Sequence, residues 1–352
     1  MKYFDGHNDV LLKLFYSKTS NIIDDFILGN NYCQIDYPKI KKSNFSGGYF
    51  AIFVADTEPD ESFFSRMNTS TSSYDFALPP TVAQDIALSN TESMIKILNE
   101  IILQSNGSIV LCKKGSDIVT NIKEKKISII LHIEGAEAID DKFKSLDKLY
   151  SLGLRSIGLV WSRKNMFATG VPFSYPSSPD RGDGLTSLGK ELIKICDYKN
   201  ILIDLSHLNE KGFWDVANIS SQPLIATHSN SHFITNHSRN LTNEQLITIK
   251  KSQGIVGINF ATAFLRNDGQ MKTDTDLQFI MNHFEHMLKY LGDDGIAIGS
   301  DFDGALVPDD IKDLTGMINL ENFMKQKGYT NKLIEKFFYK NWVNFLEKNL
   351  IN

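Results

Sequence analysis

Histidines and carboxylates that can bind metal ions stand at the ends of apolar segments along this chain. His7 and Asp9 lie two residues apart in Gly-His-Asn-Asp, so on a strand both side chains point to the same face. Glu134 ends the run Ser-Ile-Ile-Leu-His-Ile-Glu, and its two oxygens can bridge two ions, while His207 and His228 each end a further apolar run. Nitrogen and oxygen ligands of this kind suit zinc. We therefore predict that these five residues hold metal ions.

Asp301 is the candidate for proton transfer. It follows Gly-Ile-Ala-Ile-Gly-Ser, the last strand expected in the chain, which lies beside the first strand if the sheet closes into a barrel. Asp301 would then lie near His7 and Asp9, where it can take a proton from metal-bound water and pass it to a leaving group. Asp303 is the competing carboxylate, but the Asp-Gly pair that it opens predicts a structural turn.

Three other ionisable residues near these segments receive structural interpretations. His132 lies two residues before Glu134 and deeper in the strand, which favours a core histidine. Glu137 lies beyond the strand, where we expect a solvated carboxylate in a loop or at a helix start. Asp204, three residues before His207, is expected on the opposite side or lower in the fold, and we leave it out of the site.

The elements that must position these residues follow an alternating pattern. Apolar, β-branched runs bounded by glycine or polar residues predict eight strands, and most runs are nearly continuous in apolar residues, as parallel strands covered on both faces require. The strands are expected at Tyr3–Val10, Gly47–Ala55, Ile127–Glu134, Arg155–Trp161, Ile201–His207, Leu224–Ser229, Gly254–Phe260 and Gly295–Asp301. Helical spacing of apolar residues intervenes from the third strand onward. It is seen in Leu185–Tyr198, in Asp276–Leu291 and in Thr242–Lys251, which Thr242 or Asn243 can cap.

This order predicts an α/β fold, a (β/α)8 barrel of the TIM type. Every candidate residue then lies at the carboxyl end of a strand, the face on which barrel enzymes carry their active sites. We expect residues 1–352 to form a single barrel domain with a helical tail over about 319–352. The aromatic residues of the tail are expected to pack on the barrel, with a contact in a homodimer as the alternative.

Two long segments depart from the alternating pattern. Asp56–Pro80 is rich in Ser, Thr, Asp and Pro, and Phe167–Asp183 is rich in Pro, Ser and Gly. They leave the same end of the second and fourth strands, where long loops shape the substrate pocket of a barrel. The alternative interpretation is a plain surface insertion.

Composition limits the possible partners. Hydrophobic residues make up 42% and charged residues 22% of the 352 residues, which is typical of a soluble globular protein. The formal net charge of −5 predicts no nucleic-acid partner, because a basic surface is what phosphate backbones require. A small ligand fits better.

The cysteines and the chain ends favour the cytoplasm. Cys33, Cys112 and Cys196 are odd in number and widely spaced, which argues against a disulfide framework and against a thiolate zinc site. No apolar run approaches the roughly 20 residues that a membrane helix needs. We expect no cleaved leader at the start, and the final Glu-Lys-Asn-Leu-Ile-Asn lacks the apolar tail of a lipid-anchor signal.

Several short motifs together resemble one family. They are Asp5-Gly6-His7-Asn8-Asp9, Ile133-Glu134-Gly135, Gly184-Leu185-Thr186 with Gly189, Ile203-Asp204-Leu205-Ser206-His207, Thr227-His228-Ser229, Ser238-Arg239-Asn240, and Gly299-Ser300-Asp301-Phe302-Asp303-Gly304. In this order, and over nearly the whole length, the chain closely resembles the membrane (renal) dipeptidase family, the M19 metallopeptidases among the amidohydrolase-like barrels.

The resemblance implies a zinc-dependent dipeptidase with two Zn²⁺ per subunit. One ion would be held by His7, Asp9 and Glu134 with Asp301 nearby, and the other by Glu134, His207 and His228. A hydroxide bridging the ions would attack the peptide bond of a dipeptide. Glu134 and Asp301 would be the catalytic residues, and Asp301 would also contact the substrate and protonate its departing amine.

The resemblance also assigns substrate contacts. Arg239 matches the arginine that binds the free carboxylate of the substrate, a task that suits the bidentate fork of a guanidinium; the alternative is a solvated loop charge. Trp161 departs from the family pattern, because the mammalian members carry a substrate-binding histidine there. It cannot take a proton, but its indole nitrogen can still donate a hydrogen bond to the substrate.

Three rival interpretations remain open from the sequence. A related amidohydrolase could use the same centre on a β-lactam, an N-acyl amino acid or a lactone, since two metal ions do not dictate the acyl group. A second rival is a non-catalytic barrel that binds without turnover. The third is a metal-free barrel with structural histidines. Arg239 disfavours substrates without a carboxylate, and the complete ligand set disfavours the non-catalytic protein.

Overall fold

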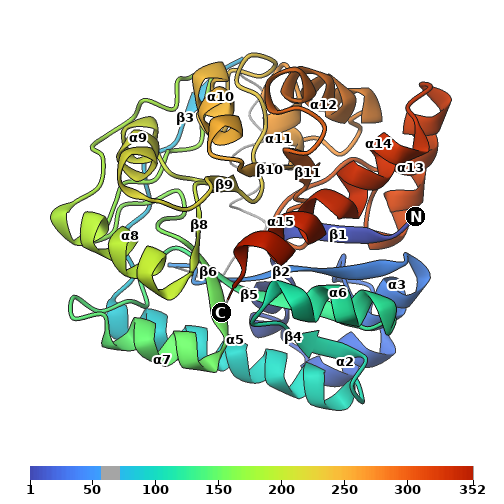
Figure 1. Cartoon of the computed structure of the whole chain (residues 1–352), viewed down its shortest axis with the longest axis horizontal. Helices are drawn as coiled ribbons and strands as arrows, with labels where there is room; N and C mark the ends of the chain where they lie inside the picture. The colour runs from blue at the N-terminus through green and yellow to red at the C-terminus, as the bar shows by residue number, and fades with distance from the viewer. Residues whose placement is uncertain (57–71, 352) are drawn as a thin grey trace.

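The computed structural model describes residues 1–56 and 72–351, and its centre is a nearly closed parallel barrel (Figure 1). Eight strands follow one another around it in the order β1-β2-β5-β6-β8-β9-β10-β11. They are β1 (Tyr3–Asn8), β2 (Phe45–Phe53), β5 (Ile127–Glu134), β6 (Leu154–Gly158), β8 (Leu202–Asp204), β9 (Ile225–Ala226), β10 (Ile255–Ile258) and β11 (Ile296–Ile298). A parallel bridge between Asn8 and Phe302 joins the end of the ring to its beginning. The predicted (β/α)8 barrel is confirmed.

Helices form an outer layer around the strands (Figure 1). Those named here are α1 (Val10–Phe15), α2 (Ile22–Leu28), α3 (Tyr37–Lys42), α5 (Gln84–Gln104), α6 (Gly115–Lys123), α7 (Lys144–Leu152), α8 (Ser187–Lys199), α9 (Glu210–Ile219), α10 (Asn243–Lys251), α11 (Thr262–Leu265) and α12 (Leu277–Leu291). The three helices that the sequence predicted correspond to α8, α10 and α12. Thr242 is the N-cap of α10, because its hydroxyl accepts from the Gln245 amide and the Gln245 side chain bonds back.

The first part of the barrel holds elements that the sequence pattern did not predict. Helical spacing was recognised from the third strand onward, and the structure adds α1, α2 and α3 after β1, and α5 and α6 between β2 and β5. A short strand, β4 (Ile109–Leu111), pairs with the start of β5 outside the ring. The alternation of strands and helices therefore begins earlier in the chain than the sequence pattern indicated.

The two long loops meet each other. β3 (Tyr74–Asp75), from the loop after β2, pairs antiparallel with β7 (Ser174–Tyr175), from the loop after β6. Arg181 donates to both carboxylate oxygens of Asp75, at 3.1 and 3.0 Å, and ties the same two loops together. The rest of the segment predicted at Asp56–Pro80 includes residues 57–71, which lie outside the described residues.

The predicted helical tail closes the amino-terminal end of the barrel. It comprises α13 (Met317–Gln326), α14 (Asn331–Glu335), the π-helical segment η2 (Lys336–Lys340) and α15 (Asn341–Asn349), preceded by the 3-10 helix η1 (Leu314–Gly316). Trp342 of α15 packs with inward-facing residues near the strand starts, including Phe4 and Tyr49, and donates a 2.7 Å hydrogen bond to the Ile298 carbonyl. The aromatic residues of the tail therefore pack on the barrel, as predicted.

Over residues 1–56 and 72–351, every helix is too short or too polar to cross a bilayer.

Candidate metal centre

His7 and Glu134 lie at the ends of β1 and β5, whereas the other candidate residues follow strands that end earlier than predicted. β8 ends at Asp204 instead of His207, and β11 ends at Ile298 instead of Asp301. His207 and Asp301 both have left-handed backbone conformations, with φ of 66° and 61°. The chain therefore turns at these positions and directs both side chains over the carboxyl end of the barrel.

The structure brings Glu134 and two histidines to one point. Glu134 Oε1 lies 3.1 Å from His207 Nε2 and 3.2 Å from His228 Nε2. The two Nε2 atoms are themselves 3.1 Å apart. All three side chains are buried. This convergence matches the second of the two ligand groups expected from the sequence.

The first expected ligand group lies beside it. His7 Nε2 is 3.3 Å from Asp9 Oδ2 and 3.7 Å from Glu134 Oε1. Ligand atoms of His7, Asp9 and Asp301 all lie within 4.8 Å of one another. A β-carbon at Gly304 would collide with the carboxylates of Asp9 and Asp301, so the absence of a side chain there lets both approach. The five predicted ligands and Asp301 thus form one cluster, the strand-end cluster.

Several polar atoms of this cluster lack hydrogen bonds among the described residues. They are both ring nitrogens of His7, Oδ1 of Asp9 and Oε1 of Glu134, and all are buried. Buried carboxylates and imidazoles that lack hydrogen bonds are costly, and a cation bound between them would satisfy the carboxylate oxygens and the imidazole lone pairs. The residues present therefore fit a metal centre.

His228 is held in the tautomer that a metal ligand requires. The Thr227 hydroxyl donates to Asp204 Oδ2 at 2.6 Å and lies 2.9 Å from His228 Nδ1. Since its one proton goes to Asp204, the hydroxyl can only accept from His228, whose Nδ1 carries the hydrogen. A neutral His228 then presents a bare Nε2 lone pair to the cluster.

The charges of the cluster shift its pKa values in opposite directions. Burial alone lowers the pKa of His7, but the neighbouring Glu134 and Asp9 carboxylates raise it to about 10. Burial, together with nearby cationic groups, holds the pKa of His207 and of His228 well below the usual range. Burial raises the pKa of Glu134, an effect that His7 opposes. The cluster thus combines the neutral imidazoles of His207 and His228 with carboxylates that favour the protonated form of His7.

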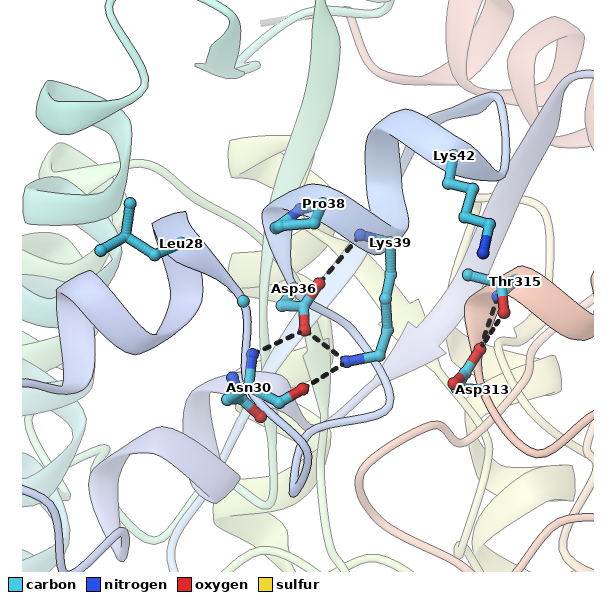
Figure 2. A pocket seen from close by; sticks show the side chains of 9 residues that line it. Leu28, Asn30, Asp36, Pro38, Lys39, Lys42, Asp313 and Thr315 are labelled. Carbon is cyan, nitrogen blue, oxygen red and sulfur yellow. Dashed lines mark hydrogen bonds and ion pairs between the residues drawn. The ribbon is translucent and has the colours of Figure 1, made fainter.

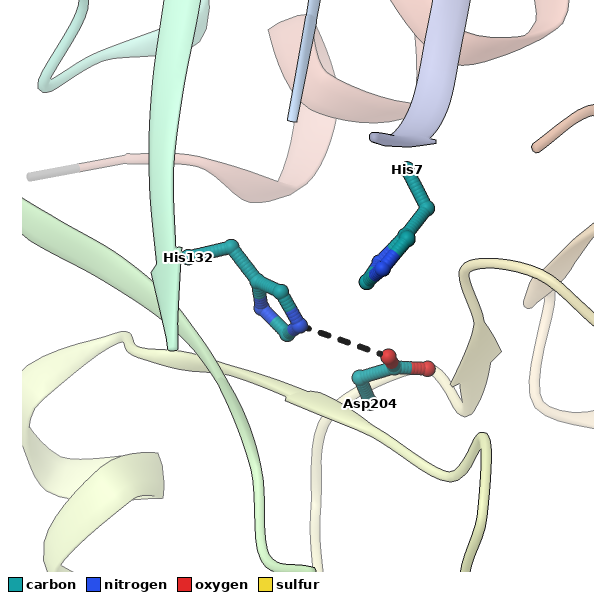
Figure 3. Close-up of side chains that lie close together, drawn as sticks. All are labelled: His7, His132 and Asp204. Carbon is teal, nitrogen blue, oxygen red and sulfur yellow. Dashed lines mark ion pairs between the residues drawn. The ribbon is translucent and has the colours of Figure 1, made fainter. Parts of the chain in front are cut away.

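A second polar group lies below the strand-end cluster, inside the barrel. His132 Nε2 is 3.6 Å from Asp204 Oδ2, and Figure 3 shows both side chains facing His7. Ser156 lies 3.0 Å from His132 Nδ1, and Asp204 Oδ1 accepts from the amides of Ser206 and Thr227 at 3.0 and 2.8 Å. His132 is buried in the core, as predicted, but its Nε2 has no hydrogen bond among the described residues. Asp204 lies lower in the barrel than the strand-end cluster, as one of the two expectations had it. It does not point to the opposite side, since its side chain faces the barrel interior and accepts hydrogen bonds from Thr227.

Asp301 has one further partner that the sequence analysis missed. Asn259, at the end of the strand predicted at Gly254–Phe260, donates from Nδ2 to Asp301 Oδ2 at 2.8 Å. Burial raises the pKa of Asp301 to about 6, and the positive charge of His7 opposes this rise. Asp303 does not join the cluster. Its carboxylate accepts from the Gln34 and Ile35 amides at 2.6 and 3.1 Å, which supports the structural interpretation.

Glu137 is the clearest error in the sequence interpretation. It was expected to be solvated, but it is buried and forms an ion pair of 2.7 Å with Arg163. Arg163 is itself fully buried and also donates to the Val54 carbonyl. The partner lies 26 residues away in the sequence, so local polarity near Glu137 could not reveal it.

Arg239 is buried beside the cluster and has no carboxylate within ion-pair distance among the described residues. Its guanidinium donates to the His228 carbonyl at 3.1 Å and lies 3.4 Å from the Ser229 hydroxyl, while its Nε has no partner there. Burial lowers the pKa of Arg239 to about 10. The alternative of a solvated loop charge is therefore wrong, and no anion pairs with this cation within residues 1–56 and 72–351.

Aromatic rings border the same region. Trp161 lies 5.9 Å from the His207 ring and 5.4 Å from the Phe173 ring, measured between centroids. Phe173 in turn stacks on Phe264 at 5.9 Å. Trp161 thus lies next to a candidate metal ligand, at the position where a substrate contact was predicted.

The structure also has a surface hollow away from these residues. It has a volume of about 460 Å³, lies between α2, α3 and η1, and is drawn in Figure 2. Its polar groups bond to one another, since Asp36 accepts from the Asn30 and Lys39 amides and Asp313 accepts from Thr315. The hollow includes none of the predicted site residues.

Known proteins resemble this chain in sequence. The sequence model of the family described as membrane dipeptidase (peptidase family M19) matches residues 1–350. An uncharacterised protein from the 5′ region of pqqA in Klebsiella pneumoniae is 42% identical over 253 residues, which cover 72% of this chain and 93% of that protein.

Solved structures agree with the fold. A metallopeptidase from Rhodobacter sphaeroides, liganded with a phosphinate mimic of the dipeptide L-Ala-D-Ala, superposes with a TM-score of 0.96 at 40% identity, covering 99% of each chain. An amidohydrolase from Pseudomonas aeruginosa superposes with a TM-score of 0.74 at 19% identity, covering 99% of this chain and 96% of that one. The expected amidohydrolase-like fold is thereby confirmed.

Proposed function

Because this chain belongs to the membrane dipeptidase family, peptidase family M19, we propose that it hydrolyses the peptide bond of dipeptides at a centre of two zinc ions. One observation carries the proposal. The bare, buried ligand atoms of the strand-end cluster lie beside Arg239, a buried cation without an anionic partner among the described residues. A dipeptide supplies a carbonyl group for the metal centre and a carboxylate for the arginine, so it matches both needs.

Two ligand groups share Glu134. His7, Asp9 and Glu134 would hold one zinc ion, with Asp301 nearby, and Glu134, His207 and His228 would hold the other. Metal ions in such a centre lower the pKa of water toward about 7 and polarise a carbonyl oxygen. Thr227 and Ser162, at 2.9 Å from the Nδ1 atoms of His228 and His207, orient the two imidazoles for this task.

Asp301 is suited to move the proton. Its carboxyl group is buried, which raises its pKa above the ordinary range and favours a group that first accepts and then releases a proton. Asn259 Nδ2 donates to Oδ2, so this bond fixes the orientation of the carboxylate, and the other oxygen, Oδ1, can face the reacting amide. In this mechanism Asp301 protonates the departing amine of the substrate.

Arg239 and Trp161 would bind the substrate. Arg239 would hold the free carboxylate of the dipeptide through its guanidinium. The indole of Trp161, next to His207, would form part of the wall around the scissile bond. The relative from Rhodobacter sphaeroides supports this substrate class, since its ligand mimics L-Ala-D-Ala.

Two coarser features of the protein also belong to the proposal. We infer one domain over residues 1–352, because α15 from the end of the chain packs against strand starts from β1 to β11. We also propose a cytoplasmic location, which the three free, buried cysteines support.

The test is zinc-reconstituted hydrolysis of L,L and L,D dipeptides, with N-acyl amino acids and a β-lactam alongside. We expect zinc-dependent release of free amino acids by the wild type. Asp301→Asn should retain its zinc and lose about 100-fold or more in kcat. Two bound ions without dipeptide hydrolysis would transfer the proposal to another carboxylate-bearing amide or a β-lactam. Full turnover by the variant would refute the role of Asp301.

A further inference from the structure

His237 is a buried histidine outside the strand-end cluster with an unused hydrogen-bond donor. Its side chain is fully buried, and its Nδ1 accepts from the Arg239 amide at 3.1 Å. Burial holds the pKa of His237 well below its ordinary range, so the ring is neutral and its one hydrogen lies on Nε2. Among the described residues, this Nε2 has no hydrogen-bond partner.

The side chains of His237 and Arg239 both lie against the ring of Phe264. The His237 ring centroid is 4.6 Å from that of Phe264, and the Arg239 guanidinium carbon lies 5.4 Å from the same ring. His237 also contacts one aromatic residue from each of the two paired loops. Its ring centroid lies 5.9 Å from that of Tyr74 and 6.3 Å from that of Phe173. Two unsatisfied donors two residues apart thus border one aromatic enclosure.

The turn that carries both residues is fixed on several sides. Ser238 Oγ accepts from the Ser174 amide at 3.1 Å, which ties the turn to β7. Asn240 donates to the carbonyls of Thr235 and Phe264, both at 2.9 Å. The direction of the His237 ring is therefore set before any ligand binds, as a preorganised donor requires.

We propose that His237 binds the substrate, donating from Nε2 to the carboxylate that Arg239 holds. A carboxylate offers about four acceptor positions on two oxygens, so it can accept from a guanidinium and an imidazole together. A neutral donor adds a hydrogen bond without placing a second cation beside Arg239. This inference rests on the proposed function, because it takes a substrate with a free carboxylate.

Two conservative variants separate this role from a structural one. His237→Asn keeps an acceptor near the position of Nδ1, and so keeps the bond to the Arg239 amide, but removes the distal donor. His237→Gln places an amide nitrogen near the position of Nε2 and loses the acceptor. We expect His237→Asn to raise KM for dipeptides by about 10- to 100-fold with little change in kcat, and His237→Gln to stay close to the wild-type KM.

The opposite order, with His237→Gln impaired and His237→Asn normal, would overturn the proposal and leave His237 as a support for the Arg239 backbone. Equal KM values in both variants and the wild type would overturn it as well. Loss of kcat in His237→Asn at unchanged KM would place the donor on the reacting carbonyl instead. Zinc content and thermal unfolding of each variant check that the centre remains intact.

A substrate without the carboxylate distinguishes this inference from the proposed function. A dipeptide amide should be hydrolysed equally by the wild type and His237→Asn, since neither can use the missing contact. If the wild type hydrolyses no dipeptide, the proposed function fails. Calorimetric binding of a phosphinate dipeptide mimic then still tests His237: weaker binding by His237→Asn alone supports the contact, and equal binding refutes it.

Discussion

The barrel holds two polar groups one above the other, and they differ in how their hydrogen bonds are satisfied. The upper one is the strand-end cluster, in which Glu134 Oε1 and both nitrogens of His7 have no hydrogen bond among the described residues. In the lower one, the Asp204 carboxylate accepts hydrogen bonds from Thr227 and the backbone, and His132 Nδ1 lies 3.0 Å from Ser156, whereas His132 Nε2 has no hydrogen bond among the described residues. Both contain a histidine and a carboxylate, and both are buried.

The difference shows that residue type alone does not make a metal site. The lower group has ligand atoms within 4.8 Å of one another, as the upper one does. Asp204, however, already accepts three hydrogen bonds, from the Ser206 amide and from the amide and hydroxyl of Thr227. A carboxylate so bonded is stable without a cation, and its role is to orient the residues above it.

The largest effect is expected at Glu134. Glu134→Gln removes the shared carboxylate and should abolish zinc binding and reduce turnover by about 1,000-fold or more. In the metal-free protein, the same change should raise the melting temperature, because burial of an ionised Glu134 is unfavourable without metal. Metal analysis and scanning calorimetry measure both.

The control is Glu321→Gln, which removes a buried carboxylate paired with Lys325 and the Met1 amine, and should lower stability. A metal-free Glu134→Gln protein less stable than the wild type would contradict the comparison.

The next effect tests whether the lower group orients the upper one. Thr227→Val preserves the side-chain shape but removes the hydroxyl that fixes the tautomer of His228. Zinc affinity should fall roughly 10- to 100-fold while the zinc stoichiometry at saturation stays the same. Competition with a chelator measures this affinity. Thr91→Val, a buried threonine on α5, is the matched control and should keep wild-type affinity. Unchanged affinity in Thr227→Val would show that the tautomer is set without Thr227.

The comparison also explains which parts of the site the sequence could predict. His7, Glu134 and His228 end apolar runs, and parallel strands bring such ends together, so the cluster follows from the strand pattern alone. Thr227, Asn259 and His237 act through contacts between separate strands or loops. Hydroxyl and amide groups are common at strand ends, so spacing in the sequence does not indicate which ring or carboxylate each one contacts.

The helices differ in the same way in how far the sequence could predict them. The helix at α8 was predicted from its amphipathic spacing, and α5 carries the same signal at Ala87, Met94, Leu98 and Ile101, although it was missed. The helices α1, α2 and α3 have six or seven residues each, too few for a helical period to stand out.

A smaller effect is expected at the lower group itself. His132→Gln removes the contact with Ser156 or with Asp204 and should cost about 1–3 kcal/mol of unfolding free energy. It should leave the zinc stoichiometry unchanged, because the lower group has no bound ion in our interpretation. Metal analysis after dialysis, together with urea unfolding, measures both quantities. Loss of one equivalent of zinc would instead identify His132 as a ligand and remove the distinction between the two groups.

The smallest effect concerns a buried histidine outside both groups. His283 on α12 accepts from the Ser231 amide at 3.0 Å and has its Nε2 3.1 Å from the Leu265 carbonyl; burial lowers its pKa to about 3. In the unfolded chain this histidine takes up a proton near pH 6.5, whereas in the folded protein it stays neutral until the pH approaches 3. Its contribution to the free energy of unfolding is therefore fully present above pH 6.5 and is lost as the pH falls toward 3. Between neutrality and about pH 5, the free energy of unfolding should fall by about 2 kcal/mol for this reason. His283→Gln should remove this part of the slope in urea unfolding of the metal-free protein. His286→Gln, at a partly exposed histidine of the same helix, should preserve it, and equal slopes in all three proteins would show that His283 is protonated in the folded state.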